Sequence, residues 1–81
     1  MNMSDDDALY RTIADVFGVE PGSLSESSSH DDVPGWDSFG MVNLIAELEQ
    51  RFAVQFDLLE IAEFVNVGVI RTILREKGAA L

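Results

Sequence analysis

The sequence predicts a small all-α protein, a four-helix antiparallel bundle with a long first loop and a short third helix. Apolar residues recur with the spacing of amphipathic helices, and a helix-starting signal precedes each such stretch. Two Pro-Gly pairs and a serine-rich run separate the first stretch from the second. The 81 residues contain no cysteine, which excludes disulfides and thiolate metal sites. They fit one domain, residues 1–81, near the lower size limit for folding without such links.

The first helix is expected to begin at Ser4–Asp7, where a serine three residues ahead of an acid matches a capping signal. Leu9, Ile13 and Phe17 then repeat on one helical face. Gly18 is the predicted end of this helix, since glycine tolerates the left-handed conformation of a C-cap.

Residues 18–37 are predicted to form a loop because they contain Pro21-Gly22, Pro34-Gly35 and a polar run between them. Loops of this length are unusual in so small a domain and commonly serve a function. Three apolar residues are expected to pin the loop to the core, namely Val19, Leu24 and Val33.

The second helix is expected over Ser38–Phe52. Its core-facing side chains fall within about 60° of Met41 when each residue turns the helix by about 100°. They are Met41, Leu44, Ile45, Leu48 and Phe52. A second apolar stripe is rotated away from the first and consists of Phe39, Val42 and Ala46. One buried stripe is enough for a bundle, so Val42 and Ala46 predict an exposed docking strip. Phe39 fits either this strip or a buried position under the loop or the third helix.

The last two helices follow from their start signals. Asp57–Glu60 predicts a short third helix ending near Val65. Asn66 is the expected cap of a fourth helix that Gly78 ends. The apolar residues of this fourth helix are Val67, Ile70, Ile73 and Leu74. The segment 53–56 resembles a brief strand but has no partner strand.

The net charge of −10, from 15 acids against 5 bases, argues against nucleic acids and anionic membrane surfaces as partners. No Lys or Arg occurs from Thr12 to Gln50, so a basic partner surface is expected to face the middle of the chain. No apolar run approaches the roughly 18 residues of a membrane span, and the N-terminus is acidic where a signal peptide is basic. The sequence therefore predicts a cytoplasmic protein without membrane insertion.

Ser38 stands where the second helix begins. It is a good N-cap, and Asp37 would serve equally well, so the Asp-Ser pair alone indicates capping. A helix N-terminus would also stabilise a phosphate attached to that serine. Capping and phosphoester formation are therefore compatible at this position.

A longer motif surrounds this pair. Asp37-Ser38-Phe39-Gly40 is followed by Val42, Leu44, Ile45, the segment 46–49 (AELE) and Phe52. This pattern resembles the phosphopantetheine-attachment motif of acyl carrier proteins, and the resemblance covers nearly the whole chain. It implies a carrier that is not itself an enzyme. Such a carrier holds an acyl or aminoacyl group as a thioester on a covalent 4′-phosphopantetheine arm and presents it to partner enzymes, and its arm supplies the thiol that this cysteine-free chain lacks.

The resemblance also implies roles for individual residues. Ser38 is the attachment site, and Asp37 supports its modification by a phosphopantetheinyl transferase with coenzyme A and magnesium. No catalytic residue and no resident metal are expected. The partner-recognition positions are Trp36, Phe39, Val42, Ala46, Glu47 and Glu49. Further expected partners of this monomer are a loading ligase for acyl or aminoacyl groups and downstream acyl-processing enzymes with basic docking surfaces.

Four positions depart from the pattern of housekeeping fatty-acid carriers. Phe39 replaces the commonest Leu, Gly40 and Asn43 stand where acids are frequent, and Trp36 is untypical. These residues look more like stand-alone polyketide-type or aminoacyl carriers, and DSFG is similar to D-alanyl carriers. Peptidyl carriers usually have His-Ser at this junction, so Asp37 argues against that branch.

Other functions remain as alternatives. A non-covalent acidic interaction module would have the same helices, with Ser38 merely capping. Hydrolysis at Ser38 would need a base, and the single histidine, His30, lies in a polar loop with nothing to fix it. A calcium loop starting at Asp31 fails because Trp36 and Val42 stand where glycine and glutamate are required.

Overall fold

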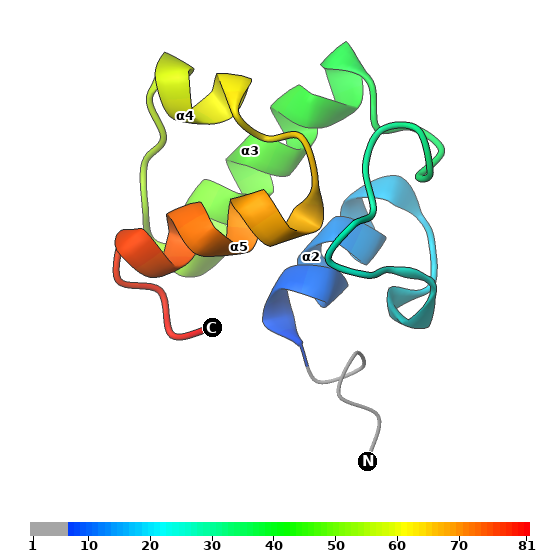
Figure 1. The fold of residues 1–81 in the computed structure, drawn as a ribbon, viewed down its shortest axis with the longest axis horizontal. Helices are drawn as coiled ribbons and strands as arrows, with labels where there is room; N and C mark the ends of the chain where they lie inside the picture. The colour runs from blue at the N-terminus through cyan, green and yellow to red at the C-terminus, as the bar shows by residue number, and fades with distance from the viewer. Residues whose placement is uncertain (1–6) are drawn as a thin grey trace.

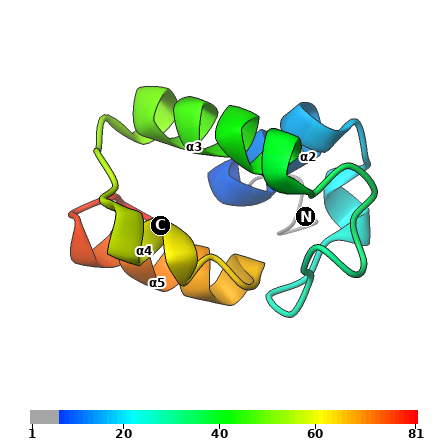
Figure 2. The ribbon, with the colours of Figure 1, turned by 90° about the horizontal axis from the view of Figure 1, so that it is seen from above.

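The fold is a bundle of four α-helices in a computed structural model that describes residues 7–81 (Figure 1). The elements are α2 (Ala8–Phe17), the 3₁₀ turn η1 (Pro21–Ser23), α3 (Ser38–Phe52), α4 (Leu58–Ala62) and α5 (Val67–Glu76). No strand occurs within the described residues, so the predicted all-α bundle is confirmed and the segment 53–56 is not a strand. Figure 2 shows α2 and α3 on one side of the molecule and α4 and α5 on the other.

The helices begin at the side chains that the sequence offers as caps. Asp37 accepts a hydrogen bond from the Gly40 amide at 2.9 Å, and Asn66 accepts one from the Val69 amide at 2.9 Å. Asp57 exchanges side-chain and backbone bonds with Glu60 in a capping box. The short helix ends at Ala62, earlier than the predicted Val65.

The first described helix starts at Ala8, capped by Asp7, whose Oδ1 accepts bonds from the amides of Leu9 and Tyr10 at 3.0 and 3.2 Å. The predicted start at Ser4 lies outside the described residues. Gly18 ends this helix as predicted, with a φ of +69° that favours glycine.

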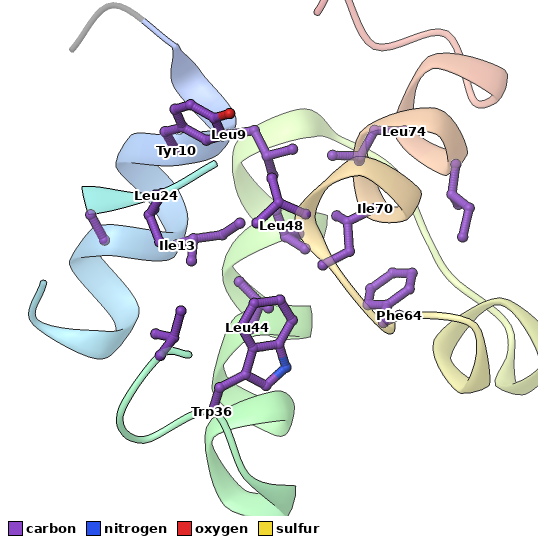
Figure 3. Packing of buried hydrophobic residues seen from close by; sticks show 14 residues of the cluster. Leu9, Tyr10, Ile13, Leu24, Trp36, Leu44, Leu48, Phe64, Ile70 and Leu74 are labelled. Atoms are coloured by element: carbon purple, nitrogen blue, oxygen red, sulfur yellow. The ribbon is translucent and has the colours of Figure 1, made fainter. Parts of the chain in front are cut away.

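The core forms where three helices meet. Its fully buried side chains come from α2, α3 and α5 and are Leu9, Ile13, Leu44, Leu48, Val67, Ile70 and Leu74. Figure 3 shows the labelled side chains of α2, α3 and α5 converging, with Trp36 at the end of the core nearest the start of α3. Burial of each large aliphatic side chain stabilises the fold by about 1.5–3 kcal/mol. None of the helices in the described part of the chain is long and apolar enough to cross a bilayer.

The long loop is packed against the bundle. Leu24 and Val33 are buried as predicted, and Val19 packs partly against the core. The backbone of the loop also bonds to the start of α5, since the Gly68 amide donates to the Glu26 carbonyl at 2.8 Å. The loop is therefore held at its middle as well as at its two ends.

A buried arginine links the loop to two helices. Arg71 donates to both carboxylate oxygens of Glu26, at 2.8 and 3.1 Å, and to Asp7 at 2.6 Å. Tyr10 donates its hydroxyl to Glu26 at 2.7 Å. The hydrogen bonds from Arg71 lower the pKa of Glu26, and the bonds to Glu26 raise the pKa of Arg71. This cluster joins α2, the loop and α5.

Candidate functional site at the start of α3

Ser38 is the first residue of α3, and its side chain is exposed. The sequence offered both Asp37 and Ser38 as the N-cap of this helix. In the structure Asp37 is the N-cap and accepts the capping bond. The Ser38 hydroxyl forms no hydrogen bond with any residue in the range 7–81, whereas many other serines of the loop are bonded. The geometry leaves Ser38 with a free hydroxyl at the surface.

The backbone that leads to Ser38 is held against α2. The ring of Trp36 stacks on that of Phe17, with centroids 5.6 Å apart and planes at 15°. The first turn of α3 lies close to Gly35 and to the ring of Phe17, and Gly40 makes this possible. A Cβ at Gly40 would clash with the Gly35 carbonyl oxygen and lie 2.7 Å from Phe17 Cε1. Two residues before Ser38 are therefore in close contact with the helices: Trp36 with Phe17 of α2, and Gly35 with Gly40 of α3.

The burial of Trp36 corrects the prediction that this residue is a partner-recognition position. Its side chain is only 4% exposed and belongs to the core cluster, so it offers no surface for a direct contact with a partner. Its aromatic ring is large and apolar, and the position next to Phe17 removes it from water. Trp36 therefore contributes to the site as a core residue that lines the hollow beside Ser38.

An open hollow of about 510 Å³ lies beside Ser38. Its lining is mostly apolar and consists of His30, Trp36, Asp37, Ser38, Met41, Val42, Ile45, Ile61 and Phe64. These residues come from the loop, α3, α4 and the segment after α4. An apolar hollow beside a free hydroxyl is suited to an apolar group attached there.

His30 lies at this hollow together with Ser38, although sequence reasoning placed it in an unfixed loop. Its ring Nε2 is 3.2 Å from Asp31 Oδ1, and 67% of its side chain is exposed. No hydrogen bond joins His30 to Ser38, so the two do not form a nucleophile–base pair. The Val67 amide bonds to the Ser28 carbonyl and ties this part of the loop to α5, and such a long-range contact leaves no signal in the sequence.

The second apolar stripe of α3 is at the surface. Phe39 is 86% exposed and Val42 65%, and Ala46 is exposed as well. The exposure predicted for Val42 and Ala46 is found, and Phe39 joins them instead of packing under the loop. We call these three residues the α3 strip.

The two glutamates expected beside the α3 strip have partners within the chain. Glu47 accepts a hydrogen bond from Arg51 at 2.9 Å, and Arg51 also bonds to Asp15 at 3.0 Å. Glu49 accepts a bond from the Phe56 amide at 2.9 Å and so supports the turn after α3. Glu47 is therefore paired with a cation, whereas Glu49 bonds to a neutral backbone amide.

Sequence reasoning missed a second apolar surface. Leu58 and Leu59 on α4 are 83% and 80% exposed, and Val65 is 56% exposed. Helix α4 has only five residues, none of them buried, and it leaves the leucines next to its cap at the surface. The sequence feature that could have predicted this surface is the position of Leu58-Leu59, directly after Asp57 at the start of a very short helix.

The site offers a nucleophilic group but no machinery of its own. Ser38 has no base within hydrogen-bond reach in the described structure. Residues 7–81 also contain no cluster of three or more acidic or histidine side chains that would hold a metal ion. The arrangement therefore suits modification of Ser38 by an external enzyme.

Comparisons with known proteins show the family of the chain. The family model described as "Phosphopantetheine attachment site" matches residues 7–74. The acyl carrier protein of Chlamydia muridarum is 31% identical over 75 residues, which cover 93% of this chain and 97% of that protein. The solution NMR structure of a holo acyl carrier protein from Geobacter metallireducens has a TM-score of 0.80 and 32% identity, over 88% of this chain and 82% of that one. The range matched by the family model spans Asp37 and Ser38.

Proposed function

The chain belongs to the phosphopantetheine-attachment family as an acyl carrier and not a catalyst, and from this premise we propose that Ser38 bears the prosthetic arm. The prosthetic group of this family is covalent 4′-phosphopantetheine. Its thiol would hold an acyl or aminoacyl group as a thioester, which a chain without cysteine cannot do by itself. The carrier would present this group to partner enzymes.

The observation that carries the proposal is the free hydroxyl of Ser38. Because Asp37 caps α3, Ser38 is spared this role and its Oγ remains exposed and unbonded within the described residues. The adjoining hollow has room for the first part of an arm or its cargo. The residues around Ser38 therefore fit the group that the family carries.

Asp37 is proposed to support the modification through its charge. One carboxylate oxygen, Oδ1, accepts the bond from Gly40. The other oxygen forms no hydrogen bond with the described residues, and the side chain is exposed next to Ser38. This free oxygen is available to a transferase complex that contains coenzyme A and magnesium.

The α3 strip is proposed as the docking surface for partner enzymes. The strip begins at Phe39, directly after Ser38, and continues through Val42 and Ala46. A protein that covers it would also reach the arm. Leu58 and Leu59 form a second exposed apolar surface, on α4. The net charge of −10 favours partners with basic surfaces, among them the transferase, a loading ligase and acyl-processing enzymes.

The cargo is proposed to belong to a specialised pathway, polyketide-type, aminoacyl or D-alanyl, and not to bulk fatty-acid synthesis. Phe39 and Asn43 support this, because both are exposed on α3 where partners would distinguish carriers. Trp36 and Gly40 support it less, since the packing against Phe17 explains both. The proposal further takes residues 1–81 as one monomeric domain that works in the cytoplasm.

The test is intact mass before and after incubation with coenzyme A, magnesium and a broad-specificity phosphopantetheinyl transferase. We expect a gain of one phosphopantetheinyl group in the wild-type protein and none in Ser38→Ala. Ser27→Ala is the matched control, because Ser27 is another exposed serine and lies in the loop. It should gain the group as the wild type does.

Two results would contradict the proposal. A gain that persists in Ser38→Ala would place the attachment elsewhere. Absence of any gain with several transferases, on folded protein, would favour the alternative in which the bundle is a non-covalent acidic interaction module.

A further inference from the structure

We propose that His30 holds the phosphate of the arm on Ser38, so that the first atoms of the arm lie over the hollow. The inference rests on the proposed attachment at Ser38 and adds a positioning residue to it. The two residues are eight positions apart in the sequence but line the same hollow. The phosphate would be bonded directly to Ser38 Oγ and would therefore lie at this shared rim.

Charge singles out His30 among the residues of the hollow. The other lining residues are apolar, apart from Asp37 and Ser38. No Lys or Arg occurs between Thr12 and Gln50. A phosphodiester on Ser38 would bring a negative charge into acidic surroundings, and an imidazolium is the group of the hollow that can give it charge-assisted hydrogen bonds.

The backbone at His30 is already ordered. The Val33 amide donates to the Ser29 carbonyl at 3.0 Å and closes the turn that contains His30. The Val67 amide donates to the Ser28 carbonyl at 3.0 Å and ties the start of that turn to α5. Val33 is buried in the core. Only the imidazole side chain would lose freedom on binding the phosphate, which keeps the entropic cost small.

Three carboxylates belong to the turn of His30 or to the hollow that it lines. Asp31 is 3.2 Å from its Nε2, Asp37 lines the same hollow, and Asp32 is bonded within the turn to the Ser29 amide at 3.1 Å. An imidazolium donates through both ring nitrogens, so it can contact Asp31 and the phosphate at the same time. The remaining groups that line the hollow do not titrate.

The experiment is ³¹P NMR of the modified protein between pH 5 and 8, on material whose mass shows one phosphopantetheinyl group. A phosphodiester lacks the ionisation that a phosphomonoester has near pH 6, so a ³¹P shift over this range reports a neighbouring group. Histidine changes its charge in this interval. We expect one sigmoidal ³¹P transition in the wild type and its loss in His30→Gln, which keeps hydrogen-bonding atoms but carries no charge.

A second measurement needs no variant. His30 is the single histidine of the chain, so its imidazole C–H resonances are unambiguous, and we expect them to shift between the unmodified and the modified protein. A flat ³¹P profile in the wild type, a transition that persists in folded His30→Gln, or unmoved imidazole resonances would each overturn the inference. Failure to gain the arm is seen earlier, by mass, and would refute attachment and inference together.

Discussion

The indole of Trp36 stacks on the ring of Phe17, with centroids 5.6 Å apart and an interplanar angle of 15°. This contact joins the end of α2 to the segment that enters α3. Aromatic pairs of this kind contribute about 0.5–1.5 kcal/mol beyond the burial of their surfaces. The exposed Ser38 thus follows, two residues later, a side chain that belongs to the hydrophobic core.

Replacing Trp36 should destabilise the whole domain. Trp36→Ala removes a buried ring and leaves a cavity, for which we expect a loss of about 3–5 kcal/mol in the free energy of unfolding, measured with denaturant. Phe39→Ala is the matched control, because Phe39 is 86% exposed. Its effect should stay within about 0.5 kcal/mol. Equal losses in the two variants would contradict the assignment of Trp36 to the core and Phe39 to the surface.

Gly40→Ala should also be destabilising, although alanine ordinarily favours a helix by about 1 kcal/mol relative to glycine. The new Cβ would clash with the Gly35 carbonyl and press on Phe17, and a backbone oxygen cannot turn away as a side chain can. Thermal and denaturant unfolding should show a net loss of about 1–3 kcal/mol. Gly22→Ala is the control, because nothing lies within 4 Å of a Cβ there. A stabilised Gly40→Ala would mean that the Gly35–Gly40 contact is not close.

Val42→Asp tests the α3 strip. Val42 is 65% exposed, so the free energy of unfolding should change by no more than about 0.5 kcal/mol. Turnover with partner enzymes should fall, because the substitution places a charge in an apolar contact surface. Steady-state rates with a transferase and a loading ligase would measure this. A large loss of thermal stability would instead assign Val42 to the core.

Asp37→Asn separates the two roles proposed for Asp37. Asparagine caps helices about as well as aspartate, so stability should be nearly unchanged. The rate of Ser38 modification, followed by intact mass over time, should fall because the free carboxylate charge is lost. Wild-type modification rates in this variant would restrict Asp37 to capping.

Glu26→Gln should change how stability depends on pH. The hydrogen bonds from Arg71 lower the pKa of Glu26 below its usual 4.5. Ionised Glu26 therefore stabilises the fold above about pH 4.5, and this contribution is lost as the pH falls through the lowered pKa. Since 51% of the Glu26 side chain is exposed, we expect a difference of only about 1 kcal/mol between wild type and variant at pH 7.

Urea unfolding at intervals from pH 7 to pH 3 would measure that difference, which should narrow below pH 4.5. Glu20→Gln, at an exposed position of the same loop, should follow the wild type throughout. A constant difference between Glu26→Gln and wild type across this range would show that the Glu26 charge does not contribute.

The sequence by itself determined the helices and the attachment motif. Helix α3 has the predicted bounds Ser38–Phe52, and the caps at Gly18, Asp57 and Asn66 are found where the sequence placed them. Capping bonds and apolar periodicity involve residues at most a few positions apart. Such features are readable without knowledge of the rest of the fold.

Tertiary structure alone decided which side chains reach the surface of the site. Trp36 lies in the core, where its ring stacks on Phe17, whereas Phe39 lies at the surface. The loop placed His30 at the hollow beside Ser38 through bonds to α5, a helix far along the chain. Burial and proximity depend on neighbours distant in sequence, and the periodicity of one helix holds no information about what packs against it.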